Sequence, residues 1–144
     1  MAFDTAHSQV VLFGGYTNNN DIVFNDTWVW NGTNWTQKSP QMSPPPLTQF
    51  AMAYDTAHSQ VVFFGGRQDD VSETWVWDGT NWTMEMPQSS PSPRDAVSMA
   101  YDSAHGQMVL FGGEYDFTQV FGDTWTWTGA GATPPPRLGP PSRR

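Results

Sequence analysis

One short pattern occurs three times along the chain and constrains the fold more than any other feature. In each copy an apolar run ends in Gly-Gly, an acidic residue with Thr-Trp follows, and Trp-x-Gly comes next. The glycine pairs begin at Gly14, Gly65 and Gly112, so successive copies lie 51 and 47 residues apart. A repeat of this length predicts similar structural units packed side by side, each burying its surface against its neighbours.

The composition favours units made of thin sheets. Aromatic residues form 15% of the 144 residues and eight of them are Trp, whereas charged residues form only 14%. Large aromatic side chains bury much apolar surface when sheets pack face against face. We therefore expect the Trp side chains to lie between the sheets.

Charge and residue usage exclude several kinds of partner and chemistry. A net charge of −8 repels phosphate backbones, so we expect no nucleic-acid partner. No apolar run exceeds five residues, which is too few to span a membrane, and we expect no membrane partner. Without Cys the chain has no disulfide, thiolate metal site or Cys nucleophile. No secretory signal is visible, the chain is expected to be soluble, and its location is unknown.

Each copy reads as four short strands. An Asp opens a polar turn after the first strand, and the apolar run, such as Val61 to Phe64, forms the second. Trp alternates with other residues in the third strand, and Asn31-Gly32 or Asp78-Gly79 then predicts a tight hairpin. The fourth strand carries Trp35 or Trp82, and the third copy has no counterpart of it.

Proline-rich segments separate the copies and predict where each sheet stops, because proline removes a backbone donor and fixes φ. A ligand for an SH3-type module is the alternative interpretation of these segments. The predicted division is three repeats at 1–39, 47–86 and 94–129, connectors at 40–46 and 87–93, and a Pro- and Arg-rich tail at 130–144, expected to be disordered.

Together, the Phe-Gly-Gly run, the Trp-bearing strand, the turn and the next Trp resemble the kelch repeat over nearly the whole chain, to about residue 129. The variant looks like the bacterial kelch-like type and is distantly similar to the central domain of galactose oxidase. It departs from the family in carrying Trp30 and Trp77 where Tyr is frequent, and in a shorter last turn. The resemblance implies an all-β fold, a kelch-type β-propeller segment of four-stranded blades with the first strand innermost. It also implies a binding platform that presents inter-strand loops to protein or glycan partners.

The number of blades raises a separate question. The family sets about six or seven blades around an axis, and the three found here would leave unpaired edges and apolar flanks. We therefore expect either a homodimer that completes a six-bladed ring or a fragment of a longer propeller.

Residues repeated in every copy are weak candidates for catalysis. His7, His58 and His105 occupy one repeat position, and we interpret them as turn residues that bond to local backbone rather than as metal ligands. The carboxylates that precede the third strand are interpreted as turn anchors and stand at Asp26, Glu73 and Asp123. We predict no catalytic residues, no metal site and no cofactor.

Two enzyme classes offer an alternative function. Galactose oxidase uses a cofactor that needs a Cys, which this chain lacks. Sialidases carry a box to which Gly122-Asp123-Thr124-Trp125 is partly similar, but they also cluster arginines, and only Arg67 and Arg94 lie within the repeats. A glycan-active enzyme, or an accessory module of one, stays the alternative to a non-catalytic scaffold.

The loops after the glycine pairs differ between copies, and variation on a repeated frame is where specificity resides. We predict a binding scaffold for protein or carbohydrate that uses these loops, the alternative being solvated connectors without a role. Their acidic residues could hold Ca²⁺, but the spacing of an EF-hand is absent. The predicted ligand-binding residues are Tyr16, Asn18, Arg67, Asp69, Tyr115 and Asp116.

Overall fold

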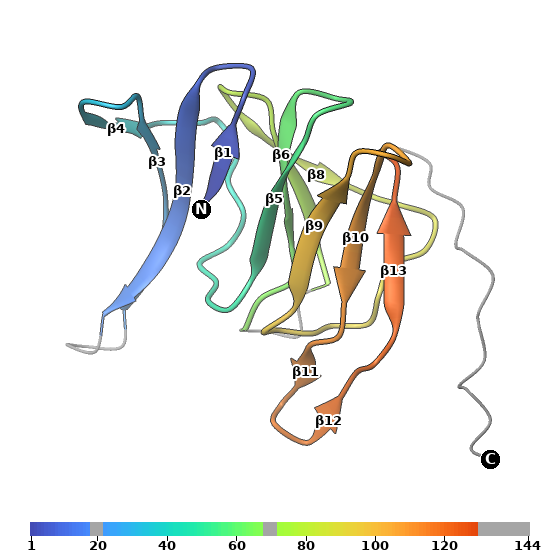
Figure 1. Cartoon of the computed structure of the whole chain (residues 1–144). Coiled ribbons are helices and arrows are strands. Elements are labelled where there is room, and N and C mark those ends of the chain that lie inside the picture. The colour runs from blue at the N-terminus through green and yellow to red at the C-terminus, as the bar shows by residue number, and fades with distance from the viewer. Residues whose placement is uncertain (18–21, 68–71, 130–144) are drawn as a thin grey trace, which may run out of the picture.

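A computed structural model describes residues 1–17, 22–67 and 72–129 of the chain (Figure 1). The described residues form antiparallel strands and no helix, which confirms the all-β, kelch-type propeller fold expected from the repeat. No helix capable of crossing a membrane is therefore found in the part of the chain that the structure describes. Asn18, Asp69 and the tail at 130–144 lie outside the described residues.

Three sheets follow one another along the chain. The first has the order β1-β2-β3-β4, formed by β1 (Ala2–Asp4), β2 (Gln9–Thr17), β3 (Ile22–Trp30) and β4 (Trp35–Lys38). The second repeats this order with β5 (Ala51–Asp55), β6 (Gln60–Phe64), β7 (Thr74–Trp77) and β8 (Trp82–Glu85). The third has three strands in the order β13-β10-β9, formed by β9 (Ser98–Asp102), β10 (Gln107–Phe111) and β13 (Thr124–Trp127). A short hairpin, β11 (Glu114–Tyr115) with β12 (Gln119–Val120), lies between β10 and β13 in sequence.

The sheets stand side by side as propeller blades (Figure 1). β5 contacts both β1 and β9, so the first strands lie nearest to one another, as the kelch resemblance implies. In the middle sheet every residue from Val61 to Phe64 is buried, because a blade covers each of its faces. This arrangement explains why the second strand is apolar without alternation.

The core consists of layers between successive blades. Val11, Phe13 and Val29 of the first sheet pack against Phe63, Trp75, Trp77 and Trp82 of the second. Phe64 of the second sheet packs with Leu110 of the third and with Val97, which directly precedes β9, and Val62 packs with Met108. Each layer thus joins neighbours, so a blade depends on the next for its burial.

Gly65, in the second glycine pair, lets the third blade approach the second. Gly65 has a φ of +69°, and a Cβ there would lie 2.6 Å from the carbonyl oxygen of Arg94. The N–H of Gly66 donates to the same oxygen at 3.2 Å. A side chain at Gly65 would collide with the backbone entering the third blade, so the residue is required for packing.

Candidate binding face

The segments that follow the glycine pairs lie at one end of the sheets (Figure 1). The turns that join β1 to β2, β5 to β6 and β9 to β10 lie at the opposite end. We call the first end the loop face and define it by its described residues, 16–17, 22–24, 67 and 114–121.

A hairpin extension carries the first part of the loop face. Beyond the glycine pair, β2 and β3 stay paired, with Gly15 opposite Phe24, Tyr16 opposite Val23 and Thr17 opposite Ile22. Because side chains alternate along a strand, Ile22 and Phe24 share one side of this extension and Tyr16 points to the other. Tyr16, Ile22 and Phe24 are all exposed, so the extension presents apolar surface on both sides.

Arg67 connects the loops of the second and third blades. The backbone N–H of Arg67 donates to the carbonyl oxygen of Thr48 at 2.7 Å. This hydrogen bond fixes the backbone just after the glycine pair. The guanidinium carbon of Arg67 lies 3.7 Å from the ring centroid of Phe117, a cation–π contact. This contact ties two variable loops together across a blade boundary.

The β11–β12 hairpin carries the third part of the loop face. Glu114 exchanges backbone hydrogen bonds with Asp95 at 2.9 and 3.0 Å, which fixes the base of the hairpin. Asp116 and Phe117 form its tip with φ values of 47° and 54°. Phe117 is 66% exposed and Val120 is 80% exposed, so the hairpin presents apolar side chains to solvent.

Four of the predicted ligand-binding residues lie on the loop face, and their binding role stays a prediction. Tyr16, Arg67, Tyr115 and Asp116 occupy its three described parts. The prediction missed Ile22, Phe24, Phe117 and Val120, which are the apolar side chains that this face exposes. Their signal in the sequence is the presence of large apolar residues in loops that are otherwise polar.

The repeated histidines belong to the opposite end and bind carboxylates rather than backbone. Nδ1 of each histidine lies 2.6 to 2.8 Å from the carboxylate of the Asp three residues earlier, in the pairs Asp4–His7, Asp55–His58 and Asp102–His105. The same Asp accepts the histidine N–H and so closes the turn. No group of three or more potential metal-binding side chains is found among residues 1–17, 22–67 and 72–129.

The repeated carboxylates hold indole rings in place. The side chains of Asp26, Glu73 and Asp123 each accept a hydrogen bond from the indole N–H of the Trp two residues later. Interpreting these side chains as turn anchors was therefore wrong. Asp123 also forms an ion pair with buried Arg94, whose Nη1 and Nη2 lie 2.6 and 3.1 Å from the two carboxylate oxygens. Hydrogen bonding from Arg94, with that from the Trp125 indole, lowers the pKa of Asp123.

Blades of this topology, first strands innermost and variable loops gathered at one end, define a kelch-type β-propeller, a class of protein-interaction scaffold that is generally non-catalytic. A comparison with family models confirms this assignment: the KLHDC2/KLHL20/DRC7 Kelch-repeats domain matches residues 2–137, and the chain belongs to this kelch-repeat family. No curated protein matches the chain.

Proposed function

We propose that the loop face binds a protein partner and that the chain performs no reaction. The supporting observation is the exposure of apolar side chains on this face, from both the β2–β3 extension and the β11–β12 hairpin. Exposed apolar side chains gathered at one end of a protein favour a contact surface. The contact between Arg67 and Phe117 supports the same proposal, because Arg and aromatic residues are enriched in protein interfaces.

A protein partner is favoured over a carbohydrate by the kind of side chain exposed. Ile22 and Val120 are aliphatic and have no group that could hydrogen-bond a sugar hydroxyl. A non-catalytic role is supported by the repeated carboxylates, since Asp26, Glu73 and Asp123 are engaged by indoles instead of being paired with one another.

The test measures how loop-face substitutions change partner capture. The chain is immobilised, a captured protein is identified, and its dissociation constant is measured by calorimetry for the parent and two double variants. We expect Ile22→Ser with Phe24→Ser, and Phe117→Ser with Val120→Ser, each to weaken binding about tenfold or more, as loss of apolar anchors does.

Met42→Ser is the matched control, because Met42 is as exposed as these residues but lies elsewhere. Its neighbour Gln41 donates its N–H to Asn81 in the β7–β8 turn, at the end opposite the loop face. Equal weakening by Met42→Ser would contradict the proposal. Glycan-array binding that the loop variants abolish would favour a carbohydrate ligand, and glycoside turnover would overturn the non-catalytic role.

We also propose that further blades cover the two outer flanks, with the repeats at 1–39, 47–86 and 94–129 acting as the units of the ring. Phe64 in the middle blade is 3% exposed, whereas its counterpart Phe111 in the third blade is 54% exposed. Either a second copy, which would complete a six-bladed ring, or the blades of a longer chain could provide the missing cover.

A further inference from the structure

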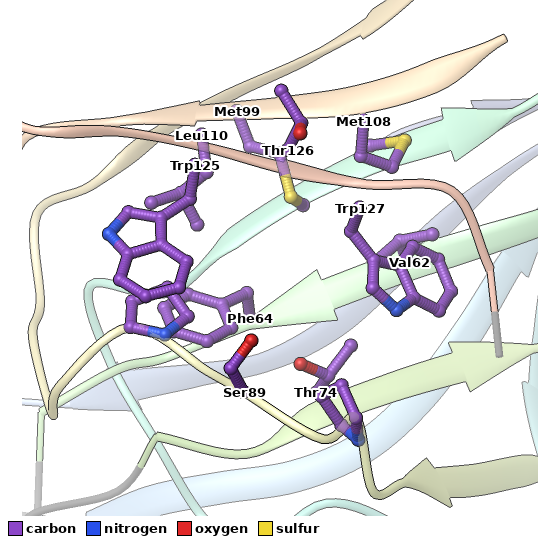
Figure 2. Close-up of a pocket in the computed structure, with 12 residues that line it drawn as sticks. Val62, Phe64, Thr74, Ser89, Met99, Met108, Leu110, Trp125, Thr126 and Trp127 are labelled. Atoms are coloured by element: carbon purple, nitrogen blue, oxygen red, sulfur yellow. The ribbon is translucent and has the colours of Figure 1, made fainter. Parts of the chain in front are cut away.

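An apolar pocket lies between the second and third blades (Figure 2). Trp125 and Trp127 of β13 border it on one side, beside Phe64 and Val62 of β6, and Thr74 of β7 lies across from them. The connector residues Pro87, Ser89 and Pro91 complete its wall. The pocket is separate from the loop face, so binding in the pocket is independent of the role proposed for that face.

The corresponding place between the first and second blades is filled by Trp82. This side chain comes from β8, the fourth strand of the second blade, and is 1% exposed. Its ring packs edge-on against Phe13 and Phe63 and lies 5.4 Å from the ring of Trp77. Its indole N–H donates to the hydroxyl of Thr27 at 2.9 Å.

Each of these neighbours of Trp82 has an equivalent at the same repeat position in the next unit, and that equivalent lines the pocket. One unit further along the chain, Phe13 corresponds to Phe64, Phe63 to Leu110, Trp77 to Trp127 and Thr27 to Thr74. All four corresponding residues, Phe64, Leu110, Trp127 and Thr74, line the pocket. The pocket is therefore the site that the Trp of a fourth strand would occupy in the third blade.

The sequence after Gly129 contains no Trp that could fill this site. Gly79 and Gly129 occupy the same hairpin position and both have a φ of 98°. Three residues after Gly79 stands Trp82, whereas three residues after Gly129 the sequence has Ala132, followed closely by Pro134, Pro135 and Pro136. Proline cannot donate to a strand ladder, so this sequence is a poor match for the Trp-bearing fourth strand of the first two blades.

Within the described ranges, no strand pairs with the edge of β13 where the fourth strand would lie. Among the described residues β13 pairs with β10 alone, whereas the equivalent β7 pairs with both β6 and β8. In the second blade Trp77 stands directly opposite Trp82, and in the first Trp30 stands opposite Trp35, with ring centroids 5.4 and 5.6 Å apart. Trp127 has no such partner within the described ranges.

We propose that the pocket and the neighbouring edge of β13, together called the slot, bind an extended strand of a partner protein. This strand carries a Trp. The strand pairs with the free edge of β13, and its Trp lies opposite Trp127 and donates its indole N–H to the hydroxyl of Thr74. Backbone hydrogen bonds to the edge give affinity, and the indole pocket gives specificity, as in other cases of strand addition. The known sequence closest in chemistry to such a partner strand is that of β8, Trp82–Glu85, with the residues beside it.

The experiment uses a synthetic fluorescent peptide with the sequence of residues 80–86, Thr-Asn-Trp-Thr-Met-Glu-Met, and the whole chain. Fluorescence anisotropy should show saturable binding. A peptide with Ala in place of its Trp should bind roughly 30-fold more weakly, since a buried Trp anchor dominates such contacts. The absence of saturable binding up to about 1 mM peptide would overturn the proposal.

Thr74→Val tests the hydrogen bond while keeping the shape of the slot. We expect it to weaken peptide binding about fivefold, the usual effect of losing one hydrogen bond. Thr27→Val is the matched control, because Thr27 holds the same position in the slot already filled by Trp82. It should leave the affinity for the peptide unchanged, and equal weakening by both variants would show that the peptide does not use the Thr74 slot.

A second variant keeps the test independent of peptide solubility. Replacing residues 130–144 with the sequence of residues 80–86 continues the turn at Gly129 into a fourth strand. We expect this variant to melt about 4 °C higher than the parent. It should also no longer bind the peptide. The same replacement with Ala in place of the Trp is the control. An equal melting temperature for the two replacement variants would contradict the proposal.

Discussion

Trp82 and Thr27 are joined by a hydrogen bond of 2.9 Å that crosses from the second blade to the first. Both side chains are buried, so this contact sits inside the layer that holds the two blades together. The hydrogen bond also satisfies the polar end of a large aromatic ring that would otherwise be buried unpaired.

Truncating this Trp should be among the most destabilising changes in the chain. We expect Trp82→Ala to lower the free energy of unfolding by about 3–5 kcal/mol, because it opens a cavity between two blades. Trp35→Ala is the control, since Trp35 holds the same repeat position but is 44% exposed at the open flank. We expect it to cost less than about 1.5 kcal/mol in the monomer. Urea denaturation measures both, and equal costs would contradict the assignment of Trp82 to a blade interface.

Replacing the glycine of the β7–β8 turn should destabilise the fold more than replacing its counterpart in the first blade. Gly79 and Gly32 have similar φ values, +98° and +95°, so Ala strains the backbone equally at both. A Cβ at Gly79 would lie 2.5 Å from Cε1 of His7, whereas nothing lies within 4 Å of one at Gly32. We expect Gly32→Ala to cost about 1–3 kcal/mol and Gly79→Ala to cost more.

His7→Ala tests whether the additional cost of Gly79→Ala comes from the His7 ring. If the additional cost at Gly79 comes from displacing the His7 ring, Gly79→Ala should cost no more than Gly32→Ala in the His7→Ala background. Denaturation of the single and double variants measures this coupling. Additive costs would show that the ring does not pack on the turn.

The repeated frame could be predicted from the sequence because most of its positions occur three times. The apolar runs, the glycine pairs and the missing fourth strand each became clear by comparison with another copy. The loop face could not be predicted in the same way, because each loop is unique. The contact between Arg67 and Phe117 joins residues of two different loops, and no local pattern reports such a contact.

The hydrogen-bond and ion-pair partners of the repeated polar residues also could not be predicted from the sequence. A carboxylate next to a strand fits a turn anchor as well as an indole acceptor, and only the side-chain directions distinguish the two. Arg94 illustrates this point: Leu47 occupies its repeat position in the second blade, so the repeat itself predicts nothing about the ion pair with Asp123.

The ion pair between Arg94 and Asp123 should make the third blade sensitive to acid. Because Arg94 lowers the pKa of Asp123 in the folded chain, the stabilisation is present above the unfolded pKa of about 3.9 and is lost as the pH falls through the folded value. We expect Arg94→Leu, which copies the natural Leu47, to reduce the loss of stability between about pH 5 and 2. Denaturation midpoints measured across this range test it, and an unchanged acid dependence would contradict it.

The exposed apolar flanks should determine whether the chain forms a dimer in solution. If a second copy covers Phe111 and Trp35, light scattering at micromolar concentration should give twice the chain mass of 16.1 kDa. Phe111→Asp should then return the chain to a monomer, because a charge placed in an apolar interface is strongly unfavourable. Met42→Asp, on the exposed connector, is the control and should leave the dimer intact. A folded monomer of the parent chain would rule out the homodimer and leave the blades of a longer propeller as the cover for both flanks.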